Sequence, residues 1–165
     1  MKAKKSLVRE ASVAALLFGL IGAAAGQGQE LNSQQKALLD SMKAFAQSKN
    51  NVQKTAQGTF YFKWLSSLPP DYEKAYFKLA ELPNGSKMLF LSLLKKTGSG
   101  YELTTLVDKD ANWTVDDAYK ATGKTLAEAD NNISKAPDKT KISITPEMHA
   151  TYKAMLEQLK YDVRQ

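Results

Sequence analysis

Apolar residues recur at helical spacing in two stretches that lie far apart in the chain. In the first, Asn32 or Ser33 can cap a helix that reaches to about Ser48, with apolar residues three to four positions apart along one side. In the second, Thr145-Pro146-Glu147 has the composition of a helix start, with a capping hydroxyl, a proline in the first turn and an acid beside it. The apolar stripe of this last helix comprises Met148, Tyr152, Met155, Leu159 and Val163.

Alternation with a period of two indicates strands in the middle of the chain. Residues 59–65 place Phe60, Phe62 and Trp64 on one side of the backbone and Tyr61 on the other. Residues 101–108 are rich in threonine, leucine and valine, a composition that favours a strand, and residues 139–144 form a shorter one.

Residues 87–96 have two interpretations. They form a β-hairpin with residues 101–108 around the glycine-rich turn 97–100, or they form a helix that Ser86 caps and Gly98 ends. Leucine is common in helices and in buried strands, so periodicity does not decide between the two.

Two further helices are expected. One runs over residues 70–82 and begins at a pair of prolines, with Tyr72, Tyr76 and Leu79 on one face. The other starts at Thr114 and continues to about residue 133, with a division at Gly123. Together the elements predict one α+β domain over residues 26–165, a small antiparallel sheet with helices packed on one face.

The first 25 residues have the three parts of a secretory signal peptide. Residues 1–10 carry four Lys or Arg, residues 11–25 are uncharged and mostly apolar, and the run ends in small residues before Gly26. The run is shorter than the ~20 residues that a membrane-spanning helix needs. We expect cleavage near Gly26. There are two alternatives: the segment stays uncleaved and anchors the chain to a membrane, which is the only membrane association that we expect, or it forms a helix of the fold.

Composition and charge narrow the classes of function. The chain has no cysteine and one histidine, which excludes thiol nucleophiles, cysteine-ligated metals, disulfides and sites with several histidines. Half of its net charge of +6 comes from Lys2, Lys4, Lys5, Arg9 and Glu10. The remainder is mildly basic, with lysines and acids interspersed, so no nucleic-acid partner is expected.

One short segment places oxygen-bearing side chains at alternate positions, as the opening of a calcium-binding loop does. The candidate ligands are Asp108, Asp110 and Asn112, with Asp116 at the ninth position. The sixth and twelfth positions hold neither the glycine nor the glutamate of such a loop. The alternative is a polar turn between a strand and a helix. Calcium is the one cofactor that the sequence suggests.

Aromatic residues crowd into residues 60–77. Packing in the core accounts for most of them, because large aromatic side chains are usually buried. A strand face can nevertheless carry more rings than a small domain buries. In that case Tyr61, Trp64 or Tyr72 would form a partner-binding surface, since aromatic anchors contribute much of the free energy of an interface.

The leader and the lack of a recognisable catalytic set together indicate a function. The one histidine, His149, has no serine in a Gly-x-Ser-x-Gly motif to activate. We expect an exported, non-enzymatic binding or accessory protein, periplasmic or secreted, whose partner is a protein or another envelope component. Two alternatives stay open: a small secreted hydrolase that uses carboxylates, and a subunit of a membrane complex or filament that an uncleaved N-terminal helix holds.

Overall fold

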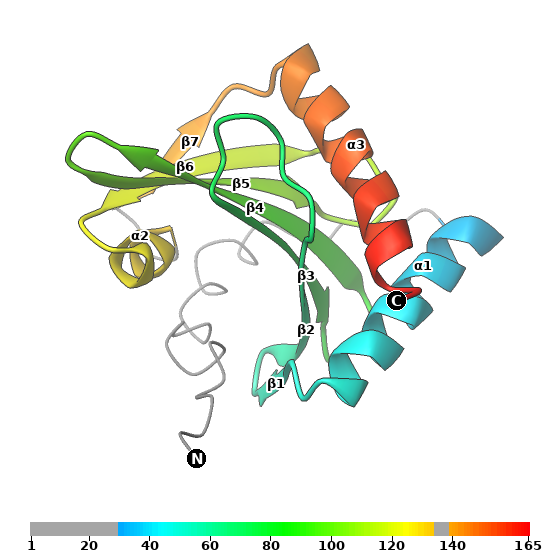
Figure 1. Cartoon of the computed structure of the whole chain (residues 1–165). Helices are drawn as coiled ribbons and strands as arrows, with labels where there is room; N and C mark the ends of the chain where they lie inside the picture. Colours follow the sequence, from blue (N-terminus) through cyan, green and yellow to red (C-terminus); the bar gives the residue numbers. More distant parts are fainter. Residues whose placement is uncertain (1–29, 134–138) are drawn as a thin grey trace.

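Seven strands form one antiparallel sheet in the order of the sequence. The computed structural model describes residues 30–133 and 139–165. The strands are β1 (Val52–Thr55), β2 (Gly58–Trp64), β3 (Lys74–Glu81), β4 (Lys87–Thr97), β5 (Gly100–Asp108), β6 (Asp117–Gly123) and β7 (Thr140–Ile142). Each strand pairs with the strands before and after it in the chain, and the sheet is strongly curved (Figure 1).

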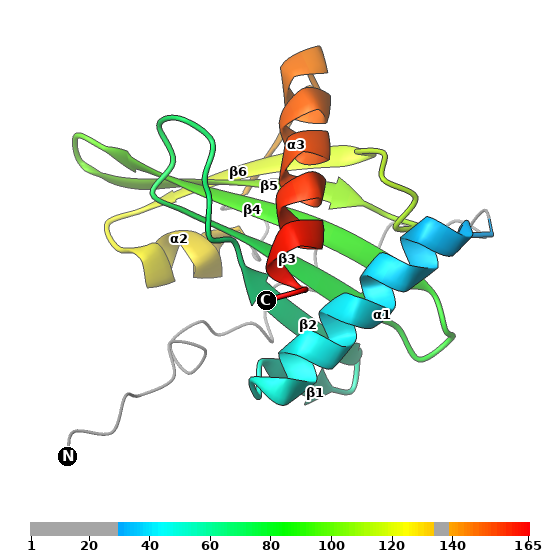
Figure 2. The same cartoon turned by 45° about the vertical axis from the view of Figure 1, so that its right-hand side comes forward.

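Three helices accompany the sheet in the described part of the chain: α1 (Ser33–Ser48), α2 (Leu126–Asn132) and α3 (Pro146–Asp162). Helices α1 and α3 lie against one face of the sheet, and α2 lies against the other (Figures 1 and 2). The α+β class is therefore confirmed. The prediction that all helices share one face is wrong for α2, whose Ala129 and the adjoining Ile133 are buried among residues of the opposite face.

The two predicted terminal helices are present, with the caps that the sequence indicates. The side chain of Asn32 accepts a hydrogen bond from the backbone nitrogen of Gln35, and the Gln35 side chain returns one to Asn32, both at 2.9 Å. Thr145 caps α3 by accepting from the backbone nitrogen of Met148 at 3.2 Å. The hairpin interpretation of residues 87–108 is also confirmed, as β4 and β5.

Two predicted helices are wrong over most of their length. Residues 74–81 form strand β3, because this segment pairs with β2 on one side and β4 on the other and buries side chains on both faces. A strand that is apolar on both faces loses the alternation that identifies it in the sequence. Residues 117–123 form strand β6, and the predicted helix is limited to α2. Strand β1 had no recognisable signal.

Gly123 explains why the chain turns from strand to helix at that point. A Cβ atom on this residue would lie 2.3 Å from the backbone nitrogen of Ala129. The missing side chain therefore lets α2 fold back closely against the end of β6.

The sheet separates two hydrophobic clusters. Under α1 and α3 the cluster includes Phe77, Leu79, Leu89, Leu91, Leu106, Tyr152 and Leu159.

No helix in the described residues is both long and apolar enough to cross a membrane. The leader predicted at residues 1–25 lies outside the described residues.

Candidate functional site

The face of the sheet on the side of α2 combines aromatic rings with buried polar groups, and Figure 1 shows that the sheet bends toward it. We call this surface the concave face. It consists of Phe60, Phe62 and Trp64 on β2, Tyr76, Lys78 and Ala80 on β3, Met88, Phe90, Ser92 and Leu94 on β4, Leu103, Thr105 and Val107 on β5, and Tyr119 and Ala121 on β6. Of the described helices, α2 alone packs on it, mainly over β5 and β6.

Four hydroxyl-bearing residues form a row across the concave face. Tyr76, Ser92, Thr105 and Tyr119 lie directly opposite one another on β3 to β6. The hydroxyls of Ser92 and Thr105 are 3.0 Å apart and buried. The Tyr76 hydroxyl donates to the carboxylate of Asp130 on α2 at 2.8 Å. The row therefore connects the middle of the sheet to the one described helix that covers this face.

Lys78 lies on the same face, two residues from Tyr76. Its side chain is 1% exposed, and its Nζ lies 4.4 Å from the centre of the Phe90 ring. Among the described residues this nitrogen has no hydrogen-bond partner. Burial lowers the pKa of the Lys78 ammonium to about 8, and the nearby charge of Asp130 offsets part of that decrease.

Asp130 is the acidic counterpart of Lys78 on this face. It is buried, and burial raises the pKa of its carboxyl group, against which the hydrogen bond from Tyr76 and the charge of Lys78 both act. Burial also raises the pKa of the Tyr76 hydroxyl well above its usual value, so Tyr76 stays a donor. Sequence reasoning missed both charged groups, because a lysine and an aspartate some fifty residues apart carry no shared signal.

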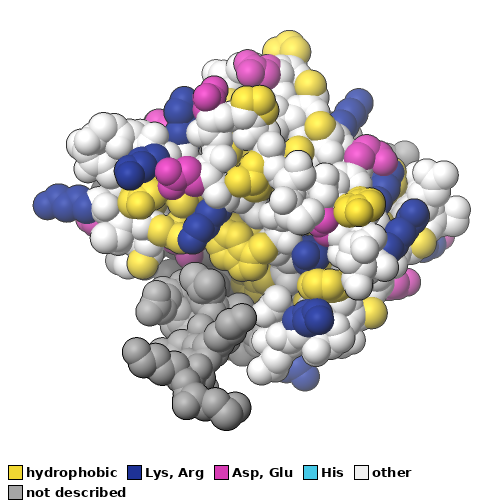
Figure 3. All heavy atoms as spheres, in the orientation of Figure 1, with side chains coloured by type: hydrophobic (Ala, Val, Ile, Leu, Met, Phe, Trp, Pro, Cys, Tyr) yellow, Lys and Arg dark blue, Asp and Glu magenta, His cyan; other side chains and the backbone are white. Residues whose placement is uncertain are grey.

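The three aromatic residues predicted to bind a partner lie in different places. Tyr61 is buried on the α1 side of the sheet, where its hydroxyl donates to Glu81 at 3.0 Å. Tyr72 lies in the β2–β3 loop and packs against the α1 and α3 cluster. Trp64 belongs to the concave face, with its ring centre 4.7 Å from that of Tyr76. Figure 3 shows hydrophobic side chains at the surface between lysines on the side of the molecule seen in Figure 1.

The structure brings together three of the four candidate calcium ligands. Carboxylate oxygens of Asp108, Asp110 and Asp116 lie within 4.8 Å of one another. Asn112 turns its amide nitrogen toward Asp110, at 2.9 Å, and its amide oxygen accepts from the backbone of Thr114. Carboxylate oxygens are ligands that calcium prefers. Calcium binding here stays a prediction that calorimetry tests, and the absence of heat at millimolar calcium would contradict it.

Asp108 also has a structural role in this loop. Its carboxylate accepts hydrogen bonds from the backbone nitrogens of Asn112 and Trp113, at 3.0 and 2.8 Å, and from the hydroxyl of Tyr152 on α3, at 2.9 Å. Burial raises the pKa of the Asp108 carboxyl to about 7. Ala111 and Trp113 have positive φ angles of 55° and 75°, and the hydrogen bonds to Asp108 hold the loop in this conformation.

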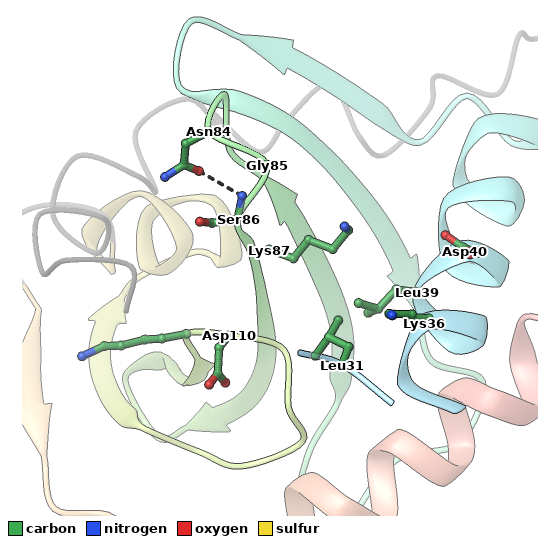
Figure 4. Close-up of a pocket in the computed structure, with 10 residues that line it drawn as sticks. Leu31, Lys36, Leu39, Asp40, Asn84, Gly85, Ser86, Lys87 and Asp110 are labelled. Atoms are coloured by element: carbon green, nitrogen blue, oxygen red, sulfur yellow. Dashed lines mark hydrogen bonds between the residues drawn. The ribbon is translucent and has the colours of Figure 1, made fainter. Parts of the chain in front are cut away.

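A cleft of about 540 Å³ opens between α1, the β3–β4 turn and the β5–β6 loop. Figure 4 shows Asp40 of α1 and Asp110 of the β5–β6 loop on opposite sides of it. Lys36, Lys87 and Lys109 also line the cleft, and each has an acidic partner within 4.0 Å. These cations are therefore already neutralised.

The concave face is the more distinctive of these arrangements. Its described residues offer an apolar wall, the buried ammonium group of Lys78, hydroxyls and the carboxylate of Asp130, whereas His149 belongs to α3 on the other side of the sheet. Such a set can hold and orient a ligand. Comparison with family models, with curated proteins and with solved structures finds no match to this chain.

Proposed function

We propose that the protein is an exported, non-enzymatic binding protein, periplasmic or secreted, that holds an apolar envelope component on its concave face. The observation that carries the proposal is the extent of the aromatic surface. Its rings run from β2 to β6, which is a distance of about 19 Å across five strands. Helix α2 has seven residues and is therefore only about 10 Å long.

The composition of the face also favours binding over a purely structural role. A core between a sheet and a helix needs no buried ammonium group, and a lysine is almost never fully buried unless it is paired. Lys78 is buried without a hydrogen-bond partner in the described part of the chain. Export is supported by the basic start, apolar run and small-residue end of residues 1–26.

A neutral fluorescent probe tests the proposal. N-phenylnaphthylamine, which fluoresces strongly only in apolar surroundings, should bind to the full chain with increased emission. A brominated long-chain alcohol, a contact-range quencher of tryptophan, should then locate the site, because the chain has two tryptophans. Trp64 lies on the concave face, and Trp113 packs against the cluster under α1 and α3.

The two tryptophans supply matched variants. The alcohol should quench Trp113→Phe, which retains Trp64, and should leave Trp64→Phe nearly unquenched. Failure of the probe to bind would overturn the proposed function. Equal quenching of both variants would show that the ligand surface lies elsewhere.

The cleft in Figure 4 favours a second candidate, the carboxylate-dependent hydrolase. Asp40 and Asp110 approach it from different elements, and paired carboxylates are the machinery of glycoside hydrolysis. Nitrophenyl glycosides test this function. Turnover that disappears in both Asp40→Asn and Asp110→Asn would favour the hydrolase over the binding protein, and no turnover by the unmodified chain would exclude it for these substrates.

A further inference from the structure

We propose that the ligand of the concave face is a long-chain fatty acid whose carboxylate pairs with Lys78. The inference rests on the proposed function and specifies the chemistry of its ligand. It depends on three features of the face: the position of Lys78, the hydroxyl row beside it and a second buried lysine nitrogen without a hydrogen-bond partner among the described residues.

Lys78 lies at the centre of the aromatic wall. It belongs to β3, and its neighbours directly across the sheet are Phe62 on β2 and Phe90 on β4. An ammonium group between aromatic rings gains some attraction from the ring faces, but it loses the hydrogen bonds that water would supply. A ligand carboxylate would restore these hydrogen bonds, and the rings around it would contact the ligand's hydrocarbon chain.

The hydroxyl row supplies further donors next to Lys78. Ser92 lies opposite Tyr76. The Ser92 and Thr105 hydroxyls form one hydrogen bond with each other, in which either of them can be the donor. The Ser92 hydroxyl also forms a hydrogen bond with that of Tyr76, and a hydroxyl that rotates away from one of these partners can donate its proton to a ligand oxygen. A carboxylate held by Lys78 and this hydroxyl would receive one hydrogen bond on each of its oxygens.

The buried nitrogens of the face favour an anionic ligand. Lys139 has a second buried nitrogen, which lies 5.0 Å from the centre of the Tyr119 ring. Among the described residues this nitrogen also has no hydrogen-bond partner. Two buried acids face the same region, Asp130 on α2 and Asp117 on β6, and Asp117 forms ion pairs with Lys109 and Lys141. Lys78 and Lys139 have no hydrogen bond to any of the described acids, and the carboxylate of a fatty acid would supply one.

Competition for the neutral probe tests the inference on the full chain. Hexadecanoic acid and hexadecanol have the same chain length and differ only in the head group. The acid should displace N-phenylnaphthylamine at roughly 10- to 100-fold lower concentration than the alcohol, as expected for a charge-assisted hydrogen bond in a buried site. Lys78→Met should abolish this preference and leave displacement by the alcohol unchanged.

Lys95→Met is the matched control, because Lys95 is exposed near the end of β4 on the opposite face of the sheet, and this variant should retain the preference for the acid. Equal displacement by acid and alcohol in the unmodified chain would overturn the inference while leaving the proposed function intact. The same holds if hexadecyl phosphate binds more tightly than the acid, or if Lys78→Met keeps the preference. If the probe itself does not bind, the proposed function fails first.

Discussion

Replacement of Lys78 by methionine should make the protein more stable, although it removes a charged group from the centre of the sheet. Methionine has a similar length and fits the same apolar surroundings, but it has no ammonium group to desolvate. Burial lowers the pKa of Lys78 from 10.5 to about 8. Each pKa unit corresponds to about 1.4 kcal/mol, so the charged lysine costs about 3 kcal/mol of folding free energy at neutral pH.

The pH dependence gives this prediction a second, independent readout. Between pH 8 and pH 10.5 the unfolded chain keeps a proton on Lys78 that the folded chain has released. The unfolded state then binds more protons, and the free energy of unfolding rises with pH over this range. The rise contributed by Lys78 should total about 3 kcal/mol and should be missing from Lys78→Met.

Urea unfolding of the full chain measures both effects. At neutral pH the variant should exceed the unmodified protein by about 3 kcal/mol, a large share of the ~5–15 kcal/mol typical of a domain. The two should converge as the pH approaches 10.5, where Lys78 loses its proton in both states. Lys95→Met controls for the titration of other groups and should match the unmodified protein. A variant that is no more stable at neutral pH, or a gap that stays constant with pH, would refute the reasoning.

Three further predictions concern the loop after β5 and the leader. Tyr152→Phe removes the buried hydroxyl that donates to Asp108 and should lower the free energy of unfolding by about 1–3 kcal/mol in urea. Asp108→Asn should remove a decline in stability between about pH 4 and pH 7. The reason is that the folded carboxyl, with its pKa raised to about 7, keeps a proton that the unfolded chain has already lost; an unchanged profile in acid unfolding experiments would contradict this. The intact mass of protein purified from its native host should correspond to a chain that begins at or near Gly26, and a full-length mass would favour the anchor.

Local signals in the sequence were sufficient where an element depends on its own residues. Helix α3 is an example, because the cap at Thr145 and the buried stripe through Tyr152 and Leu159 all belong to the same segment. Strand β6 is the opposite case. Its alanines and tyrosine suit a helix equally well, and pairing with β5 and β7, which no local pattern shows, makes it a strand.

The candidate sites differ in the same way. The acidic loop could be predicted because its residues lie within nine positions of one another, and the structure does bring Asp108, Asp110 and Asp116 together. The concave face could not be predicted. In the sequence, Lys78 cannot be distinguished from the many lysines expected at the surface. It also belongs to residues 70–82, whose pattern predicted a helix. Only the pairing of β3 with β2 and β4 places it among aromatic rings.

Asp108 and Lys78, two of the buried charged residues among those described, show how structural and functional roles can be separated. Burial raises the pKa of Asp108 and lowers the pKa of Lys78, and both shifts favour the neutral form of the side chain. Asp108 accepts three hydrogen bonds from a loop and from α3, and these contacts explain why an acid is needed there. Lys78 donates none to the described residues, so the charge of Asp130 and the ring of Phe90 offset only part of its desolvation. A group that destabilises the free protein in this way is best explained by a ligand that completes its hydrogen bonds, and Lys78→Met should therefore increase stability and abolish selectivity for the acid in the same molecule.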